Sequence, residues 1–493
     1  MNIERISRAG FLGLASAFLL VLGGCALLPE DGITAKFNDQ PSIRKTIAEE
    51  DHEAVEMARR WPRSEWWRDF RNQALNRLMD AALRDSPDLR VAVARLRQAE
   101  AFADFRAAEM RPAIDSRAVV VQQRFSETDI FGPLGGQTAT TAYVDPIVFR
   151  YHLDLWGKDR AALESALGLT RARSADLALA RLMLGSVVAR TYFRLCAADG
   201  EARLAGELVS NAEEQRRLAE LRLARGLDTR DPIHAAEQRL AAARQRKAVL
   251  DAETLRLRHK LAALAGQGPD WGLSIPVENS LYAERFPLPE KLPLELLAHR
   301  PDLTAARWRA EAAAQMVKVA KTNFYPDVDL VGFAGLRSVN LKDLFLSHGA
   351  SLAYSVGPTV SLPLFDGGRL KAQLKNQEAI YDAAIEAYNQ TLLQSVQQVA
   401  NALADWQKSH AEDAAQAQAV LAAEREAGLM GRRREAGLAT RMQALDADAI
   451  LLEQRMKLSA LEGEHFEMAV ALIEALGGGY DSGAQIAEAA VRD

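Results

Sequence analysis

The chain has 493 residues and a formal net charge of −5; 48% of its residues are hydrophobic and only 6% are aromatic. This length allows two ordinary domains or one large extended domain. Charges of both signs are interspersed along the chain, which argues against a nucleic-acid-binding protein with a basic surface.

Residues 1–24 have the organisation of a secretory signal peptide. Arg5 and Arg8 precede an apolar run from Phe11 to Leu22, which is too short to span a bilayer comfortably. The run ends in Leu-Gly-Gly followed by Cys25, a sequence that resembles a bacterial lipobox. The resemblance implies that Cys25 becomes the first mature residue and carries a covalent N-acyl diglyceride lipid. An ordinary signal peptide followed by an incidental cysteine is the alternative.

Two further residues refine this prediction. Ala26 stands where many inner-membrane lipoproteins carry an Asp, so the resemblance implies sorting to the outer membrane of a Gram-negative bacterium. The only other cysteine is Cys196, which lies in a helical pattern. If Cys25 carries lipid, no disulfide can form, and we expect Cys196 to be a buried, inert thiol.

The rest of the chain contains an internal duplication. Pro87 and Pro301 open comparable helical stretches 214 residues apart, and Thr229 and Thr440 lie in matching turns 211 residues apart. The matches divide the chain into a segment that begins at the predicted lipid site (25–85), a first repeat (86–266), a linker (267–299), a second repeat (300–477) and a tail (478–493).

Each repeat predicts the same series of elements. A helix (87–110; 301–324) stops before or at a proline and is followed by two alternating, strand-like stretches (114–124 and 143–156; 328–336 and 351–365). Long helical patterns then run from Gly157 to Gly226 and from Gly368 to Gly437, followed in each repeat by a further helix. Each of these long helices would measure about 100 Å at 1.5 Å per residue, far more than a globular domain needs.

The second long helix has the hydrophobic period of a coiled coil. Its apolar residues recur every 3.5 residues on average, at Ile385, Tyr388, Leu392, Val396, Val399, Leu403 and Trp406. Away from this seam the helix carries neutral amides, at Gln390, Gln394, Gln397 and Asn401. The amide face is either an ordinary solvated surface or the wall of a water-filled tunnel, and the sequence leaves both open.

Four strands per chain predict an oligomer. Each strand is about long enough to cross a bilayer at a tilt, and an open sheet cannot exist in lipid because its edge groups would be unpaired. Three chains would close a twelve-stranded barrel with room for a pore, whereas two would give a barrel filled by side chains. Strands in a soluble subdomain are the alternative that we disfavour.

Together these features resemble the TolC/OprM-like outer-membrane efflux protein family, in its lipoprotein branch serving resistance-nodulation-division pumps. The lipobox, the duplicated helix–strand–strand–long-helix unit and the Gly-Leu-x-Thr turns carry the resemblance. It implies a mainly α homotrimer with a small membrane β-barrel, in which a long coiled-coil α-barrel continues a twelve-stranded β-barrel. It also implies that segment 25–85, the lipid anchor and equatorial segment, and segment 267–299, the equatorial linker, contribute to a belt around the α-barrel. The implied partners are a periplasmic adaptor, an inner-membrane transporter and outer-membrane lipid, without nucleic acid.

The resemblance also assigns site residues. The turns at Gly226, Leu227 and Thr229 and at Gly437, Leu438 and Thr440 match the adaptor-contacting tips. The channel gate matches the stretch after the second turn, where Asp446 is kept but Gln443 replaces the family's first acid. Arg441 is a candidate salt-bridge partner that would latch neighbouring helices, and Asp231 is a weaker acidic candidate in the first repeat.

Neither catalysis nor metal binding is predicted. The eight histidines are scattered, and the sequence contains no nucleophile elbow, P-loop, His-Glu-x-x-His or cysteine pair. We therefore expect no enzyme, no cofactor and a passive, gated channel for drugs or other solutes. An outlet for protein secretion is the runner-up, followed by a structural coiled-coil envelope lipoprotein.

Overall fold

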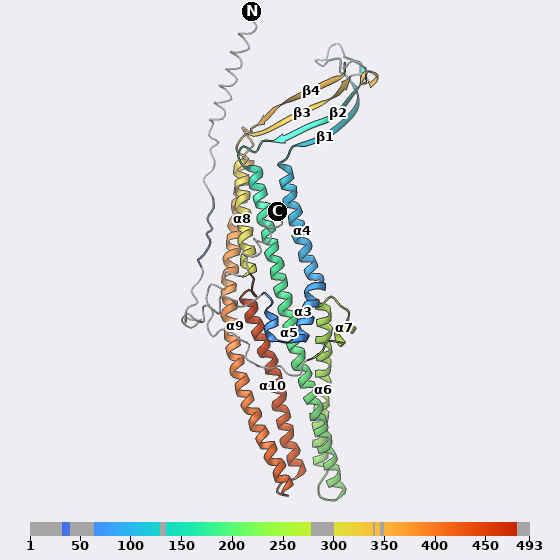
Figure 1. Cartoon of the computed structure of the whole chain (residues 1–493), viewed down its shortest axis with the longest axis vertical. Coiled ribbons are helices and arrows are strands. Elements are labelled where there is room, and N and C mark those ends of the chain that lie inside the picture. Colours follow the sequence, from blue (N-terminus) through green and yellow to red (C-terminus); the bar gives the residue numbers. More distant parts are fainter. Residues whose placement is uncertain are drawn as a thin grey trace, which may run out of the picture. The chain divides into compact units, whose positions relative to one another are not determined.

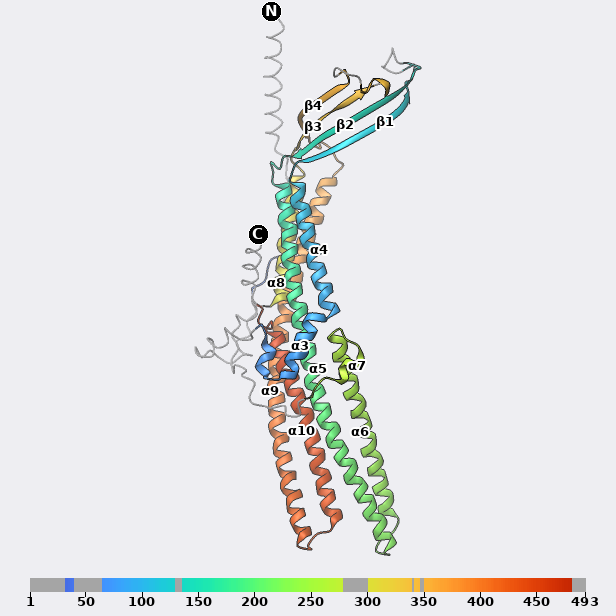
Figure 2. The ribbon, with the colours of Figure 1, turned by 45° about the vertical axis from the view of Figure 1, so that its right-hand side comes forward.

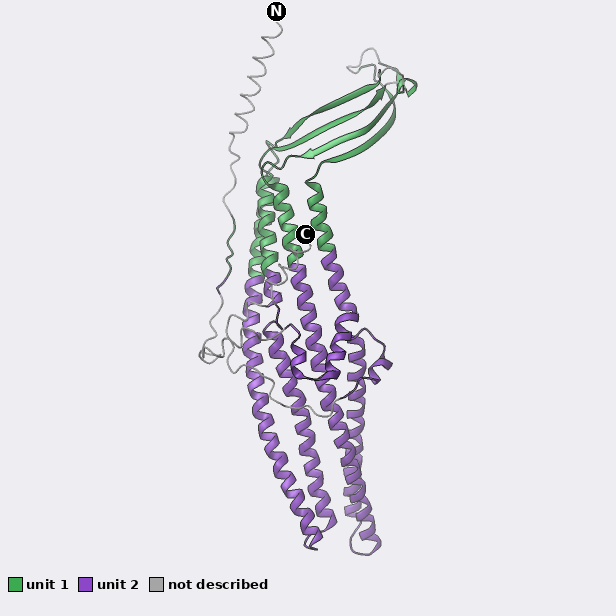
Figure 3. Cartoon of the chain, in the orientation of Figure 1, with its two compact units in different colours: residues 1–37, 98–171, 307–387 green, residues 38–97, 172–306, 388–493 purple. Residues whose placement is uncertain are grey.

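The computed structural model describes residues 32–39, 64–128, 135–277, 300–338, 341–345 and 350–480. The predicted signal peptide and Cys25 lie outside these residues. The chain divides into two compact units, coloured in Figure 3. Unit 1 comprises residues 1–37, 98–171 and 307–387, and unit 2 comprises residues 38–97, 172–306 and 388–493. Each unit draws on both halves of the sequence, so the two repeats are not separate compact bodies.

Unit 1 contains a four-stranded antiparallel sheet in the order β1-β2-β3-β4 (Figure 1). Its strands are β1 (Ala113–Arg124), β2 (Thr138–His152), β3 (Asp327–Ser338) and β4 (Leu352–Ser361). All four predicted strands are present, but β2 begins five residues earlier and ends four residues earlier than the sequence pattern suggested. Its start pairs Thr138 with Arg124, because β-branched threonines fit a strand despite their polarity.

A bulge bends β2 where it meets β3. The register shifts between Val144 and Ile147, around a proline that cannot donate to the ladder. Asp145 is buried there and forms an ion pair of 3.0 Å with Arg337 of β3. Gly335 is required opposite the bulge, since a Cβ at this position would lie 2.5 Å from the Val144 carbonyl oxygen.

The helices are long and follow the predicted repeat. Those of the first half are α3 (Gln73–Asp85), α4 (Pro87–Glu109), α5 (Lys158–Ala224), α6 (Asp231–Leu264) and α7 (Pro269–Leu273). Those of the second half are α8 (Pro301–Thr322), α9 (Arg369–Glu435) and α10 (Arg441–Ala475), and short 3₁₀ turns η1 (Trp66–Phe70) and η4 (Leu341–Asp343) complete the series. The two long helices, α5 and α9, each have 67 residues, which confirms the two uninterrupted spans. Among the described helices, none has a stretch that is long and apolar enough to cross a membrane.

The main core of unit 2 forms where the short segments meet the long helices. Trp66 and Leu75 are almost fully buried, so the described part of the expected equatorial segment packs into this core. Phe193 of α5 stacks on Phe466 of α10 at 4.8 Å between ring centroids, and Phe70 lies 4.9 Å from Phe193. Cys196 is buried in the same cluster, as the sequence predicted.

The apolar seam of α9 is also turned inward. Ile385, Leu392 and Val399 are buried, whereas the neutral amides assigned to the other face are exposed in the single chain. The 3.5-residue period therefore identified the packed face of this helix correctly. Whether the amide face lines a tunnel stays a prediction.

Candidate functional site

The two helix-turn-helix tips are residues 225–229, between α5 and α6, and residues 436–440, between α9 and α10. Figures 1 and 2 place both at the same end of unit 2. In each tip a glycine with positive φ follows the long helix, Gly226 at 65° and Gly437 at 71°. The next residue donates its N–H to a carbonyl five residues earlier, from Leu227 to Arg222 and from Leu438 to Arg433. Both tips are thus closed by the same Schellman motif, which needs glycine at this position.

After the turn, the two tips differ. Thr440 caps α10 by accepting the Gln443 N–H, and Gln443 Oε1 accepts the Thr440 N–H at 2.9 Å, which completes a capping box. In the first repeat the equivalent of Gln443 is Pro232, which has no N–H to cap. Thr229 accordingly makes no cap, and its hydroxyl lies 3.5 Å from the Asp231 carboxylate. Gln443 therefore has a structural task at the start of α10.

Beside the second tip, α10 is tied to α5 by an ion pair. The Arg441 guanidinium donates to both carboxylate oxygens of Glu214, at 2.8 and 2.7 Å. This hydrogen bond is the main reason that the pKa of Glu214 is lowered and that of Arg441 is raised. The pairing joins residues 227 positions apart in sequence and would have to break if α10 moved away from α5.

Asp446 belongs to a second group of contacts one turn further along α10. Its carboxylate accepts from Arg239 of α6 and from Gln215 of α5, both at 3.3 Å. Next to it, the buried Asn211 side chain donates to the Leu445 carbonyl at 2.9 Å. Asp446 itself is about half exposed. Of the sequence-predicted gate residues, the structure places Arg441 and Asp446 in interhelical contacts, and it places Asp231 in local contact with Thr229 instead.

Sequence reasoning missed the partners Glu214, Gln215 and Arg239. They lie on the facing helices, more than 200 residues from α10 in sequence, within stretches that are rich in charge throughout. No local spacing distinguishes them from the other polar residues of these helices. Only the packing of α10 against α5 and α6 reveals the pairs.

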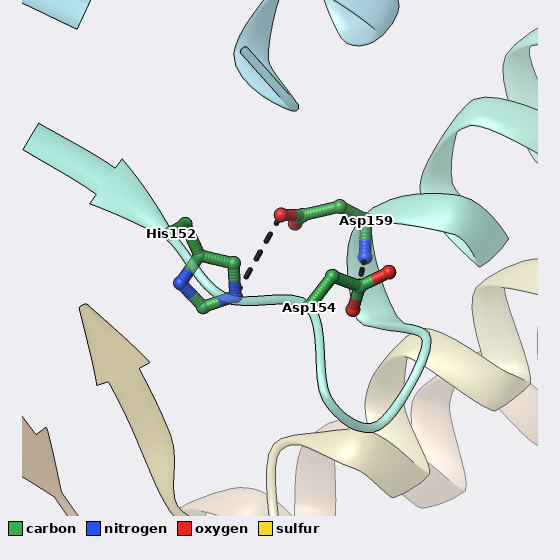
Figure 4. Close-up of side chains that lie close together, drawn as sticks. All are labelled: His152, Asp154 and Asp159. Carbon is green, nitrogen blue, oxygen red and sulfur yellow. Dashed lines mark hydrogen bonds and ion pairs between the residues drawn. The ribbon is translucent and has the colours of Figure 1, made fainter. Parts of the chain in front are cut away.

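Unit 1 contains a histidine–carboxylate cluster that the sequence did not suggest (Figure 4). Ligand atoms of His152, Asp154 and Asp159 lie within 4.8 Å of one another at the start of α5. Asp154 accepts the backbone N–H groups of Asp159 and Arg160, so it caps this helix. His152 Nδ1 lies 2.9 Å from the Asp329 carboxylate of β3. These contacts give the cluster a structural role where strand becomes helix.

Comparisons with known proteins agree with this architecture. The family model of the outer membrane efflux proteins matches residues 78–267 and 292–478. The multidrug resistance outer membrane protein MdtP of Escherichia coli K12 is 30% identical over 492 residues, 98% of each chain. The fusaric acid resistance protein FusA of Burkholderia cepacia is 34% identical over 373 residues, which cover 74% of this chain and 69% of that protein.

A solved structure gives the same result for the fold. The outer membrane protein VceC of Vibrio cholerae is 34% identical, with a TM-score of 0.76 over 85% of this chain and all of that chain. The predicted fold class, mainly helical with long helices and a small sheet, is therefore confirmed. The chain belongs to the outer membrane efflux protein family, a family of transport channels and not of enzymes.

Proposed function

We propose that this protein is the outer-membrane channel of a tripartite efflux pump, through which drugs or other small solutes leave the periplasm passively. Cys25 carries the lipid anchor, a periplasmic adaptor binds the tips, and an inner-membrane transporter of the resistance-nodulation-division type supplies the energy. The relatives' names, multidrug resistance and fusaric acid resistance, favour small organic substrates over secreted proteins.

Sheet geometry supports closure by three copies. Among the described strands, β1 pairs with β2 alone and β4 with β3 alone, so both edges of the sheet carry unpaired backbone groups. Along one face of β4, Leu352, Tyr354 and Val356 are 60–77% exposed in the single chain. Apolar residues and open edges are tolerated together in lipid only when further strands close the sheet. Three chains supply the twelve strands of a barrel with a pore.

The tips support adaptor binding. Leu227 is 69% exposed and Leu438 78% exposed, directly after the two Schellman glycines. Such apolar side chains on rigid turns suit docking against the apolar face of a partner hairpin, because the turn geometry is fixed before binding. The pair of matching tips in each chain offers two similar contacts, and a trimer offers six.

The single observation that carries the gating proposal is that two ion pairs beside the second tip join α10 to its neighbouring helices α5 and α6. Opening by outward movement of α10 would break Arg441–Glu214 and Asp446–Arg239 together. Three copies of Asp446 near a threefold axis would also concentrate negative potential and favour cations at the entrance. Adaptor contact at Leu438, just before α10, would bias the helix towards the open arrangement.

Conductance across planar bilayers tests this proposal. The purified double variant Asp446→Asn, Arg441→Ala should open spontaneously far more often than the wild type. Arg256→Ala is the matched control, because Arg256 pairs with Glu253 within α6 and bridges no other helix in the described structure. Equal leak in the double variant and the control would refute the gate.

Drug efflux tests the function as a whole. In a bacterial strain without its own outer-membrane channel, expression with a matching adaptor and transporter should restore drug resistance. Leu227→Asp with Leu438→Asp should abolish that resistance while leaving the single-channel conductance intact. Loss of both would mean that the tips are needed for folding and not for docking.

A further inference from the structure

A short extended segment that begins seven residues after the predicted lipid site runs along α9. Residues 32–39 form no helix or strand, and exposure alternates from Gly32 to Ala35, as expected for extended chain. We call residues 32–38 the strap. Several of its contacts with α9 are hydrogen bonds to side chains of the helix.

Asp382 of α9 holds the centre of the strap. Its carboxylate accepts the Thr34 N–H at 3.1 Å, the Thr34 hydroxyl at 2.8 Å and the Ala35 N–H at 3.1 Å. These hydrogen bonds, with Thr34 first, lower the pKa of Asp382. Three donors on one ionised carboxylate make a stronger contact than the same number of neutral hydrogen bonds. At neutral pH Asp382 is a charged acceptor for two successive strap residues.

Contacts on either side of Asp382 give the strap its direction. Gly32 lies so close to Glu378 that a Cβ on Gly32 would be 2.7 Å from Glu378 Oε2. Further along, the Asn38 N–H donates to Asn389 Oδ1 at 2.8 Å. The strap therefore advances along α9 in the same direction as the helix. Its Gly32 end is the end nearer the start of α9, which follows β4 in the chain.

The length of chain between Cys25 and Thr34 limits how far a lipid on Cys25 can lie from Asp382. Cys25 precedes Thr34 by nine residues, which reach at most about 30 Å when fully extended. Asp382 lies thirteen residues after Arg369, the first residue of α9, or about 20 Å along the helix. A lipid on Cys25 can thus reach the level at which α9 begins, but not much beyond it. At that level Leu364 and Phe365, between β4 and α9, are each 91% exposed, as suits contact with lipid.

We propose that Asp382 is a positioning residue that clamps the strap on α9, so that the lipid of Cys25 is held within a fixed reach of the strand–helix junction. The consequence for the lipid rests on the proposed modification of Cys25, whereas the clamp itself does not. Without the clamp, the anchor would trail from a longer and looser tether.

Limited trypsin digestion of the full-length, detergent-solubilised protein tests the clamp. Trypsin cleaves after Lys36, within the strap, and mass spectrometry of the released peptide reports both its rate and any lipid on Cys25. Asp382→Ala should accelerate this cleavage about tenfold or more, since cleavage follows the population of detached strap. Asp382→Asn keeps one acceptor oxygen and should fall between wild type and Asp382→Ala. Asp405→Ala removes an exposed carboxylate elsewhere on α9 and should cleave at the wild-type rate.

Thr34→Val provides a second test that leaves α9 unchanged. It removes the hydroxyl donor, keeps the backbone N–H groups, and should raise the rate several-fold. Wild-type rates in both Asp382→Ala and Thr34→Val, with wild-type helix content by circular dichroism, would overturn the clamp. Faster cleavage in the variants with a peptide that lacks lipid would support the clamp and refute the lipid on Cys25 instead.

Discussion

Asp413 of α9 and His465 of α10 form a partly buried pair whose pKa values are shifted in opposite directions. His465 Nδ1 lies 3.4 Å from Asp413 Oδ2, and the two side chains are only 14% and 23% exposed. Burial is the main cause that raises the pKa of Asp413 to about 6 and lowers the pKa of His465 to about 4. Both groups therefore favour their neutral forms in the folded protein.

The contributions of Asp413 and His465 to stability depend on pH in opposite directions. The folded pKa of Asp413 is above its ordinary value of 3.8, so its contribution is complete below about pH 4 and is lost as the pH rises through about 6. The folded pKa of His465 is below its ordinary value of 6.5, so its contribution is complete above about pH 6.5 and is lost as the pH falls through about 4. Each of these changes in pKa corresponds to roughly 3 kcal/mol, and the pH dependences of the two contributions nearly cancel between pH 4 and 6.

Single substitutions should reveal the pH dependence of stability that cancels in the wild type. Relative to the wild type, Asp413→Asn should gain stability as the pH rises from 4 to 6, and His465→Gln should lose it, each by roughly 3 kcal/mol. The double variant should show little change relative to the wild type. Comparison at each pH cancels the other carboxyls near the pair, including Glu412, Glu462 and Glu464, except for their coupling to Asp413 and His465.

Hydrogen exchange measured by mass spectrometry on peptides of α9 and α10 is the appropriate assay. Comparing variant and wild type at one pH removes the intrinsic pH dependence of exchange, and one pKa unit appears as a tenfold change in rate. His410, which faces both groups, stays in all variants. Parallel, rather than opposite, pH trends in the two single variants would refute the reasoning.

Three further predictions concern the tips. Arg441→Glu and Glu214→Arg should each raise spontaneous opening, and combining them should restore closure; leak in the combined variant equal to that of the singles would show that this pair does not hold α10. Gly437→Ala should destabilise the second tip by about 1 kcal/mol because its φ is 71°, whereas Gly431→Ala within α9, where a Cβ meets nothing within 4 Å, should stabilise the helix slightly; hydrogen exchange at the tip compares them. Thr440→Ala should cost about 1 kcal/mol through loss of the cap, and Thr229→Ala should cost much less because Thr229 caps nothing; equal costs would contradict the capping assignment.

Sequence periodicity predicted the helices better than the strands. The glycines at 157, 226, 368 and 437 bound both long helices to within a few residues, because a residue at positive φ cannot belong to a right-handed helix, whether it stands before its start or after its end. The strand ends were less accurate. Thr138 pairs with Arg124 in a polar stretch that resembles a turn, and Asp154 leaves the sheet to cap α5. Those choices depend on neighbouring strands and helices, which a local pattern does not contain.

The candidate gate also depends on contacts that a local sequence pattern does not contain. Arg441 and Asp446 could be named from their positions after the second turn, but Glu214 and Arg239 could not, since their contacts span more than 200 residues. At the position of Gln443 the family resemblance predicts an acidic residue, which this chain lacks. In the structure its amide completes the capping box of α10, a task that its side-chain oxygen performs without charge.

The two tips occupy matching positions of the duplication but are not equivalent. Both repeats keep the Schellman glycine, so each turn is closed in the same way, but only the second repeat has an N–H three residues after its threonine. Pro232 fixes the start of α6 through its ring, whereas α10 starts from a hydrogen-bonded cap that can form and break. The helix with the reversible start is also the one that carries Arg441 and Asp446. A gate that must open and close would place its moving part on α10, and α5 and α6 would provide the fixed partners against which it closes.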